Sequence, residues 1–248
     1  MNKIINPQYK HLEAHLLDVV NGNYTPAHVF CNRRNVVEKV MIDGKPYVVK
    51  RFKRPSLINR VAYLVRKSKA RRAYEYALQL LECGVSTPVP VAYFETRKNG
   101  LYDKACFISE YTPNKLLETV YTENVSAEKR NGILRACLDF LSGLHAKGIV
   151  PMDLNAGNVF YAEKDGGYEF SLIDINRMKF GAKPSEKDFM RSLEQCFYPI
   201  DHLCNFVMLY CEKNDVAPFE VLHKVLTLRV KRRARNRFKH KMRERRKK

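Results

Sequence analysis

The chain has 248 residues, of which 45% are hydrophobic and 11% aromatic, so a largely disordered protein is excluded and one large domain or two small lobes are expected. Its formal net charge is +19. Residues 229–248 hold thirteen Lys and Arg against Glu244, so this segment carries +12, and +19 minus +12 leaves +7 for the rest. The partners that this charge favours are polyanions: an anionic lipid surface, phosphorylated sugars or RNA.

The seven cysteines are scattered and form no C-x-x-C pair, which predicts reduced thiols without a zinc site or a disulfide framework. Asn6 and Pro7 interrupt the N-terminal apolar residues, so we expect no signal peptide. No stretch approaches the roughly 20 apolar residues that span a bilayer. These features predict a cytoplasmic protein that contacts a membrane only peripherally.

The first part of the chain is rich in β-branched runs and turn residues, which predicts two hairpins with a helix between them. The expected elements are strands over 36–41 and 46–52 joined by Asp43-Gly44, a helix over 69–83 stopped by Gly84, and strands over 91–96 and 105–111.

From Ser126, a plausible N-cap, the pattern becomes mostly helical. A helix that ends near Gly148, a loop over 151–158, a hairpin over 159–173 and helices around 186–197 and 202–210 are expected. The fold class is therefore α+β, with a small antiparallel N-terminal lobe and a mostly helical C-terminal lobe. We expect an N-terminal lobe over 1–112, a C-terminal lobe over 113–228 and a basic tail over 229–248.

Asp153, Asn158 and Asp174 form the pattern that carries chemistry. Asp153 alone would suit the capping of a turn. However, Asn158 starts the strand of a hairpin that returns the chain to Asp174, so the pairing would gather three polar side chains. Asn158 and Asp174 supply the hard oxygen ligands that Mg²⁺ prefers. Asp153 is then left to accept a hydroxyl proton during phosphoryl transfer.

Further upstream, the strand that ends at Lys50 places a lysine where it can hold the phosphates of ATP. Glu75, on the following helix, either pairs locally with Arg71 or orients Lys50. Glu110 and Tyr111 stand at the boundary between the lobes, where we expect their backbone groups to bind adenine.

The ordered set of Lys50, Glu75, Asp153, Asn158 and Asp174 resembles the protein-kinase-like superfamily. Within it, the chain is similar to the lipopolysaccharide core kinase family, on the segments 50–55, 84–90 and 172–177. The resemblance covers roughly residues 27–210. It implies a two-lobed kinase fold, ATP and Mg²⁺ as cofactors, and phosphorylation of a Kdo or heptose hydroxyl on a lipid-linked sugar at the cytoplasmic membrane face.

The sequence departs from the superfamily pattern at several places. The turn over 31–35 replaces the glycine-rich loop, so its arginines or backbone amides would have to cover the phosphates. Pro151 stands where a histidine is usual, and Ile175-Asn176 follow the metal-binding aspartate in place of Phe-Gly. No A-P-E element follows, which argues against a signalling kinase with a protein substrate.

Two alternatives stay open at this point. A RIO-like ribosome-associated kinase would use the basic tail to bind RNA. For a kinase with a lipid-linked acceptor, binding of the tail to anionic lipid fits better than binding to RNA. A pseudokinase that serves as a binding scaffold would explain Pro151 and the missing glycines. The segment 57–72, with apolar residues among basic ones, is expected to face the membrane or the substrate.

Overall fold

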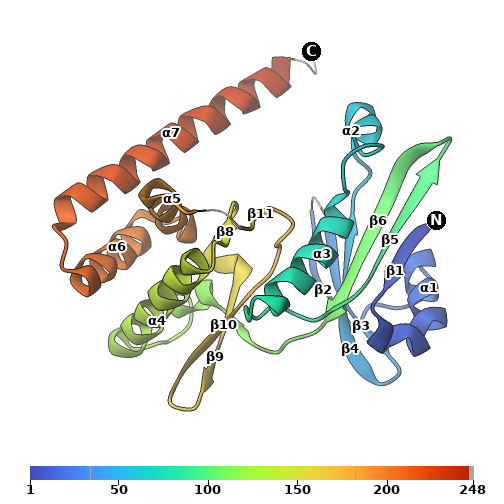
Figure 1. Cartoon of the computed structure of the whole chain (residues 1–248), viewed down its shortest axis with the longest axis horizontal. Helices are drawn as coiled ribbons and strands as arrows, with labels where there is room; N and C mark the ends of the chain where they lie inside the picture. The colour runs from blue at the N-terminus through green and yellow to red at the C-terminus, as the bar shows by residue number, and fades with distance from the viewer. Residues whose placement is uncertain (34, 182, 246–248) are drawn as a thin grey trace. The chain divides into compact units, whose positions relative to one another are not determined.

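The computed structural model describes residues 1–33, 35–181 and 183–245, and these fall into two units (Figure 1). The first unit comprises Met1–Asn114 with Ser171–Arg177, and the second comprises Lys115–Phe170 with the chain from Met178 onward. The first unit therefore ends two residues beyond the boundary expected from the sequence. The segment Ser171–Arg177, expected in the C-terminal lobe, instead belongs to the first unit.

Turn residues with a left-handed backbone close two hairpins of the first unit, including the turn predicted at Asp43-Gly44. Asp43 and Gly44 have φ of 49° and 71°, and Asn99 and Gly100 have φ of 54° and 74°. The hairpins belong to a six-stranded antiparallel sheet of order β1-β5-β6-β4-β3-β2. Its strands are β1 (Asn2–Ile5), β2 (His28–Asn32), β3 (Asn35–Ile42), β4 (Lys45–Phe52), β5 (Pro90–Lys98) and β6 (Leu101–Glu110).

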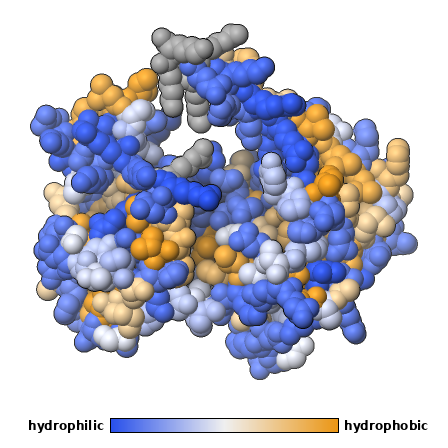
Figure 2. Space-filling view, turned by 180° about the vertical axis from the view of Figure 1, so that it is seen from behind, coloured by the Kyte–Doolittle hydropathy of each residue, from blue (hydrophilic) through white to orange (hydrophobic). Residues whose placement is uncertain are grey.

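Helices cover both faces of this sheet. The N-terminal elements η1 (Pro7–Leu12) and α1 (Glu13–Asn21) pack Leu16 and Val19 onto one face, and α3 (Lys69–Glu82) packs Ala70 and Tyr74 onto the other. The short α2 (Leu57–Ala62) contacts β6. It carries exposed hydrophobic side chains, which form a patch that Figure 2 shows bordered by hydrophilic side chains. The structure adds β1, β2, η1 and α1 to the elements that the sequence predicted.

The second unit contains small sheets and four long helices. Ser126 caps α4 by accepting a hydrogen bond at Oγ from the Lys129 amide, as predicted. The sheet order is β10-β9-β7, and β8 pairs with β11. The elements are β7 (Lys115–Leu116), η2 (Leu117–Tyr121), α4 (Ala127–Ala146), β8 (Val150–Pro151), η3 (Ala156–Asn158), β9 (Val159–Lys164), β10 (Gly167–Leu172), β11 (Met178–Lys179), α5 (Glu186–Cys196), α6 (Ile200–Asn214) and α7 (Pro218–Arg245).

Residues 229–245 of the expected basic tail form the second part of α7, which runs on from Pro218 without a break (Figure 1). Arg229 is buried against α5, so the helix is held in place where the tail was expected to begin. Residues 246–248 of the expected tail lie outside the described residues. Within the described part of the chain, no helix is long and apolar enough to cross a membrane.

Candidate active site

Lys50 and Asp174 meet in the first unit. Side chains alternate along β4, so Lys50 shares the α3-covered face of the sheet with Phe52, above whose ring the Lys50 Nζ lies at 5.6 Å. Lys50 Nζ is 2.7 Å from Asp174 Oδ1. The Lys50 side chain is largely buried, whereas that of Asp174 is 40% exposed. Two of the residues predicted from the sequence are therefore in direct contact.

The segment that carries Asp174 is tied to the first unit by polar contacts. Leu172 donates its amide to the Ser86 carbonyl at 3.0 Å, and Thr87 Oγ1 donates to the Leu172 carbonyl at 2.7 Å. Asp174 itself has φ of 54°, a left-handed conformation that costs energy in a residue with a side chain. The buried Asn176 donates to Asp174 Oδ1 and holds the carboxylate. Such strain, paid to orient one carboxylate, points to a functional role.

Lys69, which was not predicted from the sequence, also interacts electrostatically with Asp174. Burial lowers the pKa of Lys69, while the negative charge of Asp174 acts in the opposite direction. Arg177 and Arg72 lower the same pKa further through their positive charges. Asp174 thus lies in a cationic environment suited to phosphate. In the sequence, Lys69 lies in a basic run that ends at Arg72. Because the run contains many charges, the sequence gave no reason to assign Lys69, rather than another basic residue, to the site.

Glu75 does not make the contact expected with Lys50. Its carboxylate pairs with Arg71 Nε and Lys67 Nζ, each at 2.8 Å. Burial raises the pKa of Glu75, but hydrogen bonds from Lys67 and Arg71 outweigh this effect and the net pKa is lowered. The local i,i+4 pairing wins because Arg71 lies one turn away on the same helix, whereas Lys50 is already held by Asp174.

The amides of Glu110 and Tyr111, expected to bind adenine, are engaged within the first unit. They donate to the carbonyls of Val89 at 2.9 Å and Pro46 at 3.4 Å. The Glu110 carboxylate accepts the Tyr9 hydroxyl at 2.7 Å. The described contacts therefore argue against amide donation to adenine from these two residues.

Asp153 and Asn158 lie in one loop of the second unit, between β8 and β9. The loop is anchored by the buried side chains of Leu154 and Ala156. Asn158 donates its amide to the Asn155 carbonyl at 2.8 Å and its Nδ2 to the Asp153 carbonyl at 3.2 Å. This bond directs the Asn158 carboxamide, while Asp153 is exposed. Pro151, at the site of the usual histidine, is buried and pairs with Met178 in β11.

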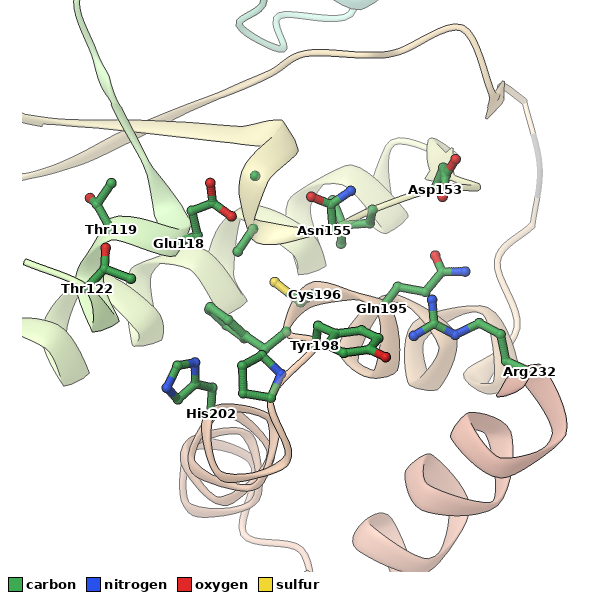
Figure 3. Close-up of a pocket in the computed structure, with 15 residues that line it drawn as sticks. Glu118, Thr119, Thr122, Asp153, Asn155, Gln195, Cys196, Tyr198, His202 and Arg232 are labelled. Carbon is green, nitrogen blue, oxygen red and sulfur yellow. The ribbon is translucent and has the colours of Figure 1, made fainter. Parts of the chain in front are cut away.

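Asp153 lines a pocket of about 500 Å³ in the second unit (Figure 3). This volume is typical of small-ligand sites. Gly157 leaves room in the wall, because a Cβ there would lie 3.0 Å from Glu118 Oε2 and 3.1 Å from Asn155 Oδ1. The wall is mostly polar or aromatic and consists of Glu118, Thr119, Thr122, Asp153, Leu154, Asn155, Ala156, Gly157, Gln195, Cys196, Phe197, Tyr198, Pro199, His202 and Arg232.

Arg232 brings a positive charge from α7 to this pocket (Figure 3). Its Nη2 lies 2.8 Å from Glu194 Oε1, on a carboxylate that is 1% exposed. Arg232 lies in the segment predicted to be a basic tail, and its contact with α5 is not visible in a run of basic residues. The pocket thus combines hydrogen-bonding groups with one fixed guanidinium.

Two further features bear on the binding of metal ions and of phosphates. Among the described residues, no group of three or more His, Cys, Asp or Glu side chains could hold a metal ion. In the turn that replaces the glycine-rich loop, the Arg33 amide donates to the Asn35 carbonyl at 3.2 Å. Arg34 of this turn lies outside the described residues.

A family model described as the lipopolysaccharide kinase (Kdo/WaaP) family matches residues 23–201. The chain belongs to this family. A search of curated proteins finds no match.

Solved structures agree with the fold expected of a Kdo/WaaP kinase. The structure described as WaaP in complex with acyl carrier protein is 15% identical, with a TM-score of 0.59 over 95% of this chain and 99% of that one. The crystal structure of WbdD is 14% identical, with a TM-score of 0.53 over 81% of this chain and 50% of that one. The predicted α+β, protein-kinase-like fold is thus confirmed, as is the resemblance to the family.

Proposed function

We propose that this protein uses ATP to phosphorylate a hydroxyl of a Kdo or heptose residue in the lipopolysaccharide inner core, acting peripherally at the cytoplasmic face of the membrane. The observation that carries the proposal is Asp153 at the wall of a pocket with polar and aromatic side chains, in a chain that belongs to a lipopolysaccharide kinase family. The pocket volume and its polar and aromatic lining suit a sugar.

In this proposal Asp153 accepts the proton of the sugar hydroxyl and orients its oxygen toward the phosphorus. Arg232 binds an anionic group of the acceptor, such as a carboxylate or phosphate, because its guanidinium is held in place by Glu194. Glu118 and Asn155 are close to the Gly157 backbone and supply hydrogen bonds to other hydroxyls.

We propose ATP and Mg²⁺ as the cofactors. Asp174 takes both Lys50 and Asn176 on Oδ1, and its exposed carboxylate offers a hard oxygen for a cation. Asn158 uses Nδ2 on the Asp153 carbonyl, so Oδ1 is the atom it would offer to the metal. ATP supplies the phosphoryl group, and Mg²⁺ neutralises its charge. Lys50, with Lys69 nearby, would bind the phosphates, and Glu75 would act only indirectly by ordering α3.

The family match favours a sugar acceptor over the RIO-like alternative. Sedimentation with ribosomes or with anionic liposomes separates the two. A pseudokinase scaffold would be indicated if purified protein with ATP and Mg²⁺ released no ADP in the presence of inner-core lipopolysaccharide.

The acceptor is tested by mass spectrometry of lipopolysaccharide from cells with and without this protein. We expect one inner-core sugar to lose one phosphate when the protein is absent, and to regain it with the wild-type chain but not with Asp153→Asn. Identical lipopolysaccharide from all these cells would overturn the proposed acceptor.

A further inference from the structure

The α2 segment of the first unit exposes an unusual number of aliphatic side chains. Ile58 is 81% exposed and Val65 is 89% exposed, and the neighbouring Leu57, Val61 and Leu64 are exposed as well. Single exposed aliphatic residues are common on protein surfaces, but five within nine residues form a patch. Figure 2 shows this hydrophobic patch where α2 lies. Such a patch marks an interaction surface.

Two other residues of this segment, Arg60 and Tyr63, fix it to the sheet. The side chain of Arg60 is buried, and its Nε and Nη2 donate to the carbonyls of Tyr102 at 2.6 Å and Lys98 at 3.2 Å. The Tyr63 ring lies 4.7 Å from the Tyr102 ring. The exposed aliphatic side chains therefore belong to an element that these contacts anchor to the sheet.

Basic residues flank the patch on both sides. Residues 53–72 contain eight Lys and Arg and no Asp or Glu. Lys53 and Arg54 precede the patch and Arg66 and Lys67 follow it, and all four are exposed. This pattern, aliphatic in the centre and cationic at the border, is complementary to a surface of acyl chains covered by anionic headgroups.

We propose that α2 and the turn after it, residues 57–66, insert into the interface of an anionic lipid bilayer. Aliphatic side chains enter the boundary between headgroups and acyl chains, and the flanking cations bind the headgroup phosphates. A two-fold dimer through the same patch is disfavoured, because it would bring the cationic borders of both copies together without an acidic partner. The inference concerns lipid contact and does not depend on the identity of the acceptor sugar.

The chain contains no tryptophan, so a single Trp reports on one position. Val65→Trp is compared with Phe219→Trp, since Phe219 on α7 is also 81% exposed. With vesicles of phosphatidylglycerol and phosphatidylcholine, we expect the emission of Val65→Trp to shift to the blue and to be quenched by brominated acyl chains. We expect neither change for Phe219→Trp. Equal responses from both variants, or no response from Val65→Trp, would overturn the proposal.

A double variant, Ile58→Asp with Val65→Asp, tests the same contact by sedimentation with these vesicles. We expect the double variant to bind the vesicles at least tenfold more weakly than wild type. At about 0.5 M NaCl electrostatic attraction is screened, so binding of the double variant should vanish, whereas wild type should keep binding through its apolar contact. Phe219→Asp, the matched control, should bind as wild type does. Unchanged binding of the double variant would refute insertion, as would a wild-type dimer in sedimentation velocity that the double variant abolishes.

Activity on a deacylated, water-soluble acceptor separates this inference from the proposed function. The double variant should phosphorylate such an acceptor at the wild-type rate, because neither residue belongs to the proposed catalytic or binding groups. Loss of vesicle binding with normal activity supports insertion, whereas a wild type that binds vesicles and phosphorylates no core sugar contradicts only the proposed function. A double variant that loses the far-ultraviolet circular dichroism of the wild type is replaced by Ile58→Ser with Val65→Ser, to which the same outcomes apply.

Discussion

Arg229 of α7 and Glu194 of α5 form an ion pair in which both side chains are almost completely buried, with 3% and 1% of their surface exposed. Arg229 also donates to the carbonyls of Glu194, Phe197 and Tyr198, which lie at the end of α5 and just beyond it. These contacts satisfy backbone groups that a helix end leaves open. Arg232, one turn further along α7, pairs with the same Glu194 carboxylate and lines the pocket. The ion pair therefore positions a residue of the candidate site.

Glu194→Gln is expected to destabilise the protein by about 3–5 kcal/mol, because it leaves the buried Arg229 without its counter-charge. Urea denaturation measures this loss. Glu186→Gln is the matched control, since Glu186 also lies on α5 and pairs with α7, through Lys224, but is largely exposed. It should cost less than about 1 kcal/mol. Equal effects of the two substitutions would contradict the structural role of the buried pair.

Arg232→Gln should raise the KM for the sugar acceptor about tenfold, the effect of losing one charge-assisted hydrogen bond. The KM for ATP should not change. Initial rates with each substrate varied in turn provide the test, with Arg235→Gln as a control on the exposed surface of the same helix. If the KM for ATP rises while that for the acceptor is unchanged, Arg232 does not contact the acceptor.

The sequence predicted most elements of the sheet and of α3, α4, α5 and α6 because local signals specify them. Asp43-Gly44 closes a turn and Ser126 caps a helix, and each does so through residues next to it in the sequence; the structure confirms both. The contact between Lys50 and Asp174 was harder, since the two residues are 124 positions apart. The order of motifs assigned both residues to one site but predicted no contact between them. Glu75 was assigned to Lys50 by that same order, but the nearer Arg71 and Lys67 compete successfully in the structure.

The packing of the C-terminal helix against α5 could not be predicted from composition. A run of basic residues is compatible with a solvated helix or a disordered extension, and it is Glu194 on another helix that makes Arg229 a buried anchor. The same applies to Ser171–Arg177, whose place in the first unit depends on hydrogen bonds with Ser86 and Thr87.

Asp174→Ala should abolish Mg²⁺-dependent ATP turnover and leave the fold intact, because its carboxylate is exposed and takes no part in the core. With wild type, ATP and Mg²⁺ should raise the Tm as ligand binding stabilises the folded state, and chelation by EDTA should reverse most of this rise. Differential scanning fluorimetry measures both effects. A variant that keeps the full rise in Tm and the full turnover would remove Asp174 from the metal site.

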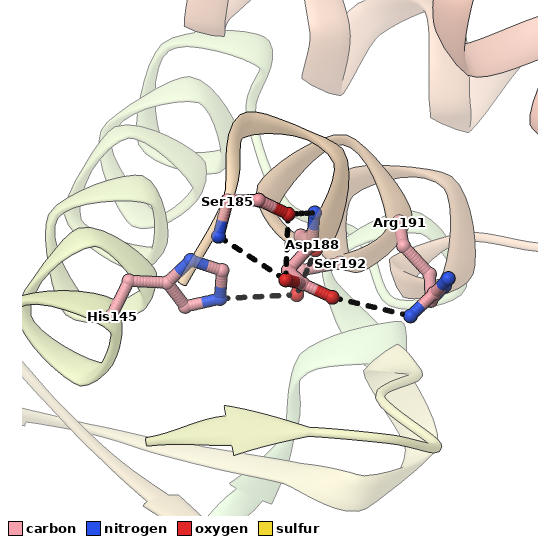
Figure 4. A network of polar contacts seen from close by, with 5 residues as sticks. All are labelled: His145, Ser185, Asp188, Arg191 and Ser192. Carbon is pink, nitrogen blue, oxygen red and sulfur yellow. Dashed lines mark hydrogen bonds and ion pairs between the residues drawn. The ribbon is translucent and has the colours of Figure 1, made fainter. Parts of the chain in front are cut away.

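His145 should make stability depend on pH. Its ring lies 3.4 Å from Ser192 Oγ, beside the Ser185–Asp188 cap of α5 (Figure 4). The same ring packs edge-on against Phe189. Burial lowers the pKa of His145 below 6.5, although Asp188 opposes the shift. The unfolded chain then binds more protons than the folded one as pH falls from about 6.5, so the free energy of unfolding decreases over this range.

Urea midpoints at about pH 7.5 and pH 5.5 test this dependence on either side of the ordinary histidine pKa. We expect a smaller decrease for His145→Gln than for wild type, while His11→Gln, at an exposed position, should behave as wild type does. An identical decrease in all three proteins would show that His145 is not the group responsible.

The most direct test of the account is transfer of radiolabelled phosphate from ATP to purified inner-core lipopolysaccharide by wild type and by Asp153→Asn. If Asp153 accepts the proton of the sugar hydroxyl, wild type labels the sugar and the variant is slower by about a hundredfold or more, with unchanged affinity for ATP. Labelling by the variant at the wild-type rate, or no labelling of the sugar by wild type, would contradict it.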